Sequence, residues 1–162
     1  MYNNVLIFEE DNLGSEPVTL QEAKDWGKIE TSTDDTIVTA LIKAARRTCE
    51  KFTGIGFITR DITLHVDLTD NYFSLPYGPV TGGPSAVDTD GNVVDLVYNM
   101  GQIEDPLGRM VLSYTGGYAT LPEDLEVALK CQFLYMYENR GEGSDGMSPI
   151  AKMILSPLRV VV

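Results

Sequence analysis

Residues 34–54 read DDTIVTALIKAARRTCEKFTG, and this stretch carries the clearest structural signal in the chain. Its apolar residues recur every three or four positions, which is the spacing of one face of an α-helix. They are Ile37, Leu41, Ala45, Cys49 and Phe52. We expect Asp34 or Asp35 to cap the start of this helix and Gly54 to end it in a left-handed conformation.

The opposite face of this predicted helix is basic. It gathers Lys43, Arg46, Arg47, Glu50 and Lys51 at the same three- and four-residue steps. Residues 36–60 carry five Lys and Arg and one Glu, a net charge of +4, in a chain whose net charge is −12. The face is either a solvated outer surface or a contact for an acidic surface, and the nearest such surface is a neighbouring copy. The four cations are therefore interface candidates.

Two short helices are predicted, one near each end of the chain. Thr19 and Glu22 form a capping box, in which each side chain satisfies a free backbone amide of the other residue, ahead of a helix over residues 20–28. A last helix begins at Ser148 and ends at Pro157.

A longer helix is predicted over residues 122–139, with Pro122 at its first position. Apolar residues cover most of its circumference, so we expect burial on several sides, either inside the domain or against another subunit. Its interface candidates are Val127, Cys131 and Leu134.

The middle of the chain changes its periodicity from helix to strand. Apolar residues alternate over residues 62–68, which predicts a half-buried strand. A hairpin over 86–98 is expected to turn at Asp90-Gly91, and a further strand covers 109–114. We therefore predict one α+β domain over residues 1–162, with a β-rich insert at 57–118. Its core is expected to be mainly helical, with two N-terminal helices, a long C-terminal helix and a short one, around a central strand-and-hairpin insert.

Composition narrows the class of protein. The length of 162 residues suits one domain, and an acidic chain with a single basic segment is unlike a conventional nucleic-acid binder. No apolar run is long enough to cross a bilayer, and residues 1–10 do not have the pattern of a signal peptide, which predicts synthesis in the cytoplasm. Cys49 and Cys131 have no metal-ligand spacing, and we interpret them as reduced core residues.

The sequence contains no recognisable catalytic motif. The single histidine, His65, shares the polar face of its predicted strand with Thr63 and Asp67, which favours a surface role. The paired acids suit turns and helix caps, and the glycine-rich stretch 78–83 lacks the ending of a phosphate-binding loop. We expect no catalytic, cofactor or metal site and no enzymatic activity. A small ligand-binding or regulatory α+β domain, or an enzyme of unfamiliar type that uses acidic pairs, stays open as an alternative.

Seven segments, taken in order, resemble the head–tail connector proteins of tailed bacteriophages. No single segment is diagnostic, and the ordered set spans nearly the whole chain. The segments are Pro17 to Ala23, Asp34 to Gly54, Ile58-Thr59, Leu75 to Val80, Gly117 to Ala128, Tyr137-Glu-Asn-Arg140, and Ile154 to Arg159.

The resemblance implies a structural protein of the virion neck. Such a protein docks beneath the portal ring after DNA packaging, and about a dozen copies form an annulus that extends the DNA channel towards the tail. Its implied partners are other copies, the portal protein and the next neck or tail-completion protein, and DNA passes through without sequence-specific binding. The apolar C-terminal tail is expected to be loose and to bind the portal or a neighbour's sheet edge, through the candidates Leu158, Arg159, Val160 and Val161.

Overall fold

The computed structural model of this chain describes residues 5–69, 72–104, 108–140 and 146–160. The chain divides into two compact units. The sheet unit comprises residues 1–14, 58–119 and 162, and the helical unit comprises residues 15–57 and 120–161. Each unit is described by itself below.

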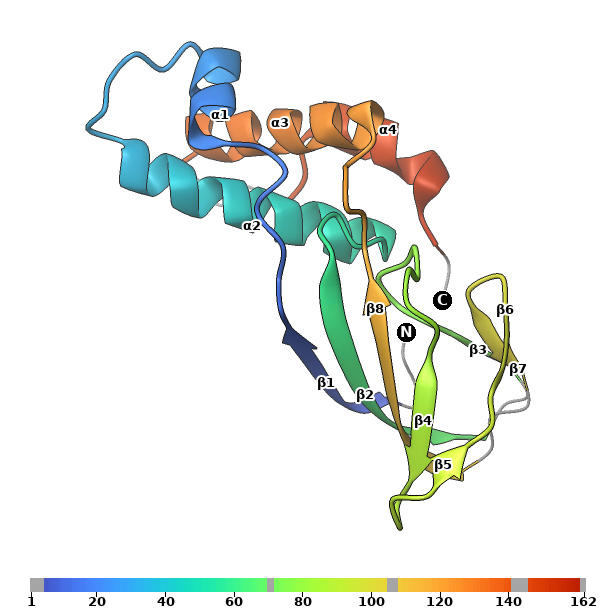
Figure 1. Cartoon of the computed structure of the whole chain (residues 1–162). Coiled ribbons are helices and arrows are strands. Elements are labelled where there is room, and N and C mark those ends of the chain that lie inside the picture. The colour runs from blue at the N-terminus through green and yellow to red at the C-terminus, as the bar shows by residue number, and fades with distance from the viewer. Residues whose placement is uncertain (1–4, 70–71, 105–107, 141–145, 161–162) are drawn as a thin grey trace. The chain divides into compact units, whose positions relative to one another are not determined.

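The helical unit contains α1 (Leu20–Gly27), α2 (Asp35–Thr53), α3 (Glu123–Glu138) and α4 (Pro149–Leu155), followed by a 3₁₀ turn, η1 (Ser156–Leu158) (Figure 1). The predicted capping box is confirmed, because the Thr19 hydroxyl accepts from the Glu22 amide and the Glu22 carboxylate accepts from the Thr19 amide. Gly54 ends α2 with a φ of +75°, as predicted. All four predicted helices are present, with bounds one or two residues from those expected.

The core of the helical unit lies between the apolar faces of these helices. Ile42, Ala45 and Cys49 of α2 are buried, as are Leu125, Leu129 and Phe133 of α3. Gln132 of α3 is fully buried as well, and both ends of its amide are bonded. Its Nε2 donates to the Gly146 carbonyl at 2.7 Å, and its Oε1 accepts from the Ser148 amide at 2.8 Å. Since a buried amide must find partners, Gln132 fixes the start of α4 on α3.

The sheet unit is built from two antiparallel sheets. The larger has the order β1-β2-β8-β4-β5 and the smaller has the order β3-β7-β6. The strands are β1 (Val5–Asp11), β2 (Arg60–Leu68), β3 (Tyr72–Ser74), β4 (Ser85–Asp88), β5 (Val93–Val94), β6 (Val97–Asn99), β7 (Gln102–Glu104) and β8 (Gly108–Gly116). The two nine-residue strands, β2 and β8, pair along their whole length at the centre of the larger sheet (Figure 1).

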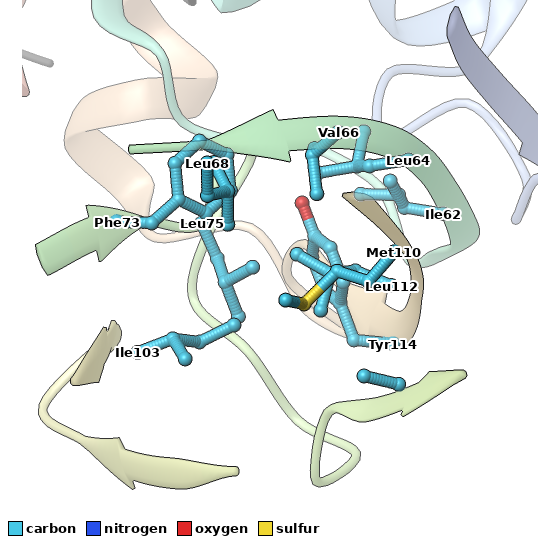
Figure 2. Packing of buried hydrophobic residues seen from close by; sticks show 11 residues of the cluster. Ile62, Leu64, Val66, Leu68, Phe73, Leu75, Ile103, Met110, Leu112 and Tyr114 are labelled. Atoms are coloured by element: carbon cyan, nitrogen blue, oxygen red, sulfur yellow. The ribbon is translucent and has the colours of Figure 1, made fainter. Parts of the chain in front are cut away.

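One face of the larger sheet is buried against the smaller one. Alternate residues of β2 and β8 point into this core, and Phe73 and Ile103 reach it from the smaller sheet (Figure 2). Because side chains alternate along a strand, the other face of the sheet carries the polar residues. Tyr114 is buried with its hydroxyl bonded to the Pro76 carbonyl at 2.7 Å, so its burial leaves no polar group unsatisfied.

The predicted fold class is wrong in one respect, because the core is not mainly helical. The fold is a sheet-rich α+β arrangement with two antiparallel sheets. Two features of this fold were not predicted from the sequence. They are β1, which forms an edge of the larger sheet, and the whole smaller sheet, whose strands have three residues each. A strand of three residues is too short to show the alternation of apolar and polar residues by which a strand is predicted.

The predicted hairpin over 86–98 is only partly correct. The turn at Asp90-Gly91 is present, but β4 and β5 pair through two residue pairs, and β6 belongs to the other sheet. The strand predicted at 62–68 is confirmed as β2, and the strand predicted at 109–114 as β8. A single domain over residues 1–162 with an insert at 57–118 stays a prediction.

Candidate assembly surface

The outward face of α2 carries three exposed cations in one line. Lys43, Arg47 and Lys51 are spaced four residues apart, so they follow one side of the helix over about 12 Å. Within the described part of the chain, none of the three makes an ion pair or a side-chain hydrogen bond. We call Lys43, Arg47 and Lys51 the basic stripe. Their interface role stays a prediction.

Arg46, the fourth predicted cation of this face, points inward instead. Its side chain is 3% exposed and donates to Glu16 Oε2 and Glu50 Oε2, at 2.8 and 2.7 Å. Burial lowers the pKa of Arg46, but its hydrogen bonds and the charges of Glu16 and Glu50 outweigh this, so the pKa is raised. Arg46 is therefore a buried cation of the helical unit and does not belong to the outward face on which the sequence placed it.

The buried Arg46 also accounts for Glu50, which lies on the same predicted basic face. Glu50 is buried, and its Oε1 accepts from the Phe57 amide at 2.7 Å. Arg46 and Glu50 therefore neutralise each other's charge, and Glu50 also provides an acceptor for a backbone amide in the segment that follows α2. Periodicity could not reveal that Arg46 is buried, because its other carboxylate partner, Glu16, lies thirty residues away in the sequence.

The α3 candidates lie along a partly covered side of that helix. Val127 is exposed, while Cys131 and Leu134 are half-buried. The fully buried side of α3 is formed by other residues, which are Leu125, Ala128, Leu129, Gln132 and Phe133. Val127, Cys131 and Leu134 therefore keep apolar surface available, and their role as subunit contacts stays a prediction. Cys131 and Cys49 are both free thiols, and of the two only Cys49 is buried as a core residue.

The C-terminal candidates are exposed but anchored. The Val160 amide donates to the Thr53 carbonyl at 2.8 Å, and the Arg159 guanidinium lies 5.6 Å from the centre of the Phe52 ring. Leu158 belongs to η1. The prediction of a loose tail is therefore wrong for Leu158, Arg159 and Val160. Val161 lies outside the described residues.

Charge is divided unequally between the two units. The sheet unit contains eleven Asp and Glu and two Lys and Arg, a net charge of −9, and the helical unit contains thirteen and ten, a net charge of −3. Both cations of the sheet unit are paired, Arg60 with Glu10 at 2.9 Å and Arg109 with Asp67 at 2.8 Å. The sheet unit therefore presents acidic surface, and the unpaired basic surface lies on the helical unit.

Sequence analysis missed an acidic group on the outer face of the larger sheet. Asp11 lies directly opposite Asp61 in the β1–β2 register, and Glu9 shares their face two residues along β1. Hydrogen bonds from Asn12 and Thr115 lower the pKa of Asp61, which keeps this carboxylate charged. We call Glu9, Asp11 and Asp61 the acidic triad. The strand-forming run Val-Leu-Ile-Phe at residues 5–8 was the signal that could have placed β1, and with it these acids.

The described residues contain no group of three His, Cys, Asp or Glu arranged to hold a metal ion. In that same part of the chain, no helix is long and apolar enough to cross a membrane. His65 lies half-buried on β2, opposite Ile7 and Val111.

No family model matches this sequence, and no curated protein matches it. Among the solved structures that share its fold, three are each aligned over 97% of both chains. A chain in the neck of an empty gene transfer agent (GTA) particle, computed with C6 symmetry, is 23% identical with a TM-score of 0.75. A chain in the virion of a native GTA particle is 22% identical with a TM-score of 0.74. A chain in the neck of a native GTA particle, computed with C12 symmetry, is 23% identical with a TM-score of 0.67. The predicted resemblance is confirmed at the level of the fold, which this chain shares with chains from the necks of gene transfer agent particles.

Proposed function

We propose that this protein is a structural, non-enzymatic component of a virion neck that forms a ring beneath the portal. The ring extends the DNA channel and joins the DNA-filled head to the tail. The observation that carries this proposal is the shared fold, which covers 97% of this chain and 97% of a chain from a particle neck. A match over the full length of both chains indicates the same architecture rather than one common motif.

The symmetry of the neck structures supports a ring. Two of the similar chains come from necks computed with C6 and C12 symmetry. Rings form when one surface of a subunit binds a different surface of the next subunit and the rotation closes. The unequal charge of the two units supplies two such different surfaces on one chain.

The negative charge of the sheet unit is compatible with a position on the lining of a channel through which DNA passes. Its net charge is −9, and both of its cations are already paired with carboxylates. Acidic surface repels phosphate within the screening length of roughly 8 Å at physiological salt. DNA can then pass close to the protein without being held.

The proposal assigns His65 no catalytic task. Within the described residues, its side chain makes no hydrogen bond to a carboxylate, hydroxyl or thiol that could activate it or be activated by it.

The portal and the next neck protein are the proposed partners. The exposed apolar residues of the C-terminal segment, Leu158 and Val160, are proposed to bind the portal.

Binding to the portal tests this function. Portal rings encoded by the same genome would be immobilised, and binding of the purified protein would be measured by interferometry and by the stoichiometry of the eluted complex. We expect saturable binding with six or twelve copies to each portal ring, as the C6 and C12 symmetries suggest. A protein that does not bind the ring at any concentration would contradict the portal assignment.

A variant that lacks residues 159–162 should bind more weakly, and unchanged binding would exclude the tail as the contact.

A further inference from the structure

We propose that the basic stripe on α2 of one copy binds the acidic triad on β1 and β2 of a second copy. The proposal rests on the proposed ring, for which it names the surface that joins neighbouring subunits. Its occupant is a second copy of this chain, and the argument is charge complementarity.

Among the unpaired cations of the described residues, only those of the basic stripe follow one side of a single helix. Lys24, Arg46, Arg60, Arg109, Lys130 and Arg140 each lie within 4 Å of a carboxylate in the same chain. Lys43, Arg47 and Lys51 do not, although Asp and Glu outnumber Lys and Arg by two to one overall. The other unpaired cations, Lys28, Lys152 and Arg159, do not lie on α2. Like charges four residues apart on a helix repel each other, so the stripe weakens an isolated helix. An anionic partner removes this repulsion.

The acidic triad is also destabilised by repulsion between like charges, which are negative here. Like charges directly opposite each other across two strands are destabilising, and Asp11 and Asp61 occupy such a pair. Asn12 and Thr115 bond to Asp61, which holds its charge in place rather than neutralising it. The triad is exposed, so it is accessible to a cationic partner.

The two surfaces match in scale as well as in sign. Successive cations of the stripe are about 6 Å apart along the helix axis. Glu9 and Asp11 are about 7 Å apart along β1, and Asp61 lies about 5 Å to the side of Asp11. A helix that lies along β1 can therefore place successive cations near successive carboxylates.

DNA is a weaker candidate for the stripe. Three cations on a chain of net charge −12 would draw phosphate against the field of the whole molecule, and the helical unit that carries them is itself at −3. In a second copy, the stripe would instead meet the surface of the sheet unit, where the charge of −9 is concentrated.

Charge reversal with complementation tests the contact. The stripe variant is Lys43→Glu with Arg47→Glu, and the triad variant is Glu9→Lys with Asp11→Lys, which leaves the bonded Asp61 unchanged. The control is Lys28→Glu with Lys152→Glu, which alters the net charge as much as the stripe variant does and changes two exposed cations outside the stripe. Circular dichroism would verify that each variant is folded. Self-association would be measured by sedimentation velocity at about 0.05 M and about 0.5 M salt.

We expect the wild-type protein and the control to associate at low salt and to dissociate at high salt. Each reversed variant alone should associate roughly 100-fold more weakly, because two attractive contacts become repulsive. An equal mixture of the stripe and triad variants should recover association, since the reversed stripe then meets a reversed triad. Recovery on mixing requires that the two surfaces touch each other.

Four outcomes would overturn the contact. Stripe and control variants that associate equally would show that the stripe is solvated. Loss of association without recovery on mixing, together with lost binding of a short DNA duplex by the stripe variant, would assign the stripe to nucleic acid. If annular particles form equally well with wild-type and stripe proteins, the contact is wrong and the proposed function stands. If wild-type protein neither associates at either salt concentration nor assembles on the portal, both fail.

Discussion

Tyr137, in the last turn of α3, donates a hydrogen bond of 2.7 Å to Oδ2 of Asp34, which precedes α2. Arg140 donates to the same carboxylate oxygen at 3.3 Å, and its guanidinium lies 4.1 Å from the centre of the Tyr137 ring. Asp34 makes no side-chain bond to the α2 backbone. The end of one helix therefore holds the start of another, and a residue expected to be a cap serves as the acceptor.

This relationship predicts a stability that depends on pH. The hydrogen bond from Tyr137 and then the charge of Arg140 lower the pKa of Asp34 from its ordinary value of 3.8. A carboxyl whose pKa is lowered by folding stabilises the protein above its unfolded pKa and loses that effect as the pH falls through its folded pKa. Tyr137→Phe should therefore lower the melting temperature at pH 7, and the difference from wild type should shrink below about pH 4. Tyr135→Phe, on the same helix, is the control, and a difference that does not change between pH 7 and 3 would contradict the assignment.

Gly117 is predicted to tolerate no side chain. Its φ is +96°, and a Cβ built there would lie 2.0 Å from the Ile58 carbonyl oxygen. Gly91 has a similar φ of +85° but no atom within 4 Å of the same position. Gly91→Ala should cost about 1 kcal/mol through backbone strain alone, and Gly117→Ala should cost at least ~3 kcal/mol because a clash with backbone is added. Urea unfolding of both variants checks this, and equal costs would show that the close approach does not matter.

Arg46 should contribute far more to stability than its neighbour Arg47. Removing Arg46 leaves Glu50 buried without its cation, which typically costs about 3–5 kcal/mol. We expect Arg46→Met to lower the free energy of unfolding by an amount near the lower end of this range. Its other partner, Glu16, is partly exposed, so water can solvate that carboxylate when the cation is removed. Arg47→Met should change the free energy of unfolding by less than about 0.5 kcal/mol. Both would be measured by denaturant unfolding at high salt, where the proposed contact between subunits is expected to be weakened. Similar values for the two variants would refute the buried pair.

The two thiols should react at different rates. Burial, and then the charge of Glu50, raises the pKa of Cys49 to about 12, so almost no thiolate forms at neutral pH. Cys131 is half-buried, and burial raises its pKa as well. We expect iodoacetamide at pH 8 to label Cys131 before Cys49, with both labelled in urea. Mass spectrometry of the timed reaction gives the order of labelling. Faster labelling of Cys49 than of Cys131 would contradict the burial of Cys49 in the helical unit.

The helices could be predicted because their signals are local. The capping box of Thr19 and Glu22 and the ending at Gly54 involve residues at most a few positions apart, and both are present. The buried face of α2 was less certain. Apolar residues occur at both 37/41 and 38/42, and the structure buries Val38 and Ile42 while Ile37 is exposed. Periodicity alone cannot choose between two adjacent apolar lines.

The features that were missed depend on pairing across the chain. β1 is a strand because it pairs with β2, more than fifty residues later, and Arg46 is buried because Glu16 approaches it from thirty residues away. The C-terminal segment is held through the Thr53 carbonyl, which no local pattern at Val160 indicates. The basic stripe was visible in the sequence, but its three members could be separated from Arg46 only in the fold.

Negative-stain electron microscopy tests the central claim most directly. The purified protein would be imaged alone at high concentration and after incubation with portal rings encoded by the same genome. The account predicts annular particles with an open centre in at least one sample, either free or as an added layer on the portal, with the sixfold or twelvefold symmetry suggested by the related neck structures. Dispersed single subunits in both samples, with no added layer on the portal, would contradict it.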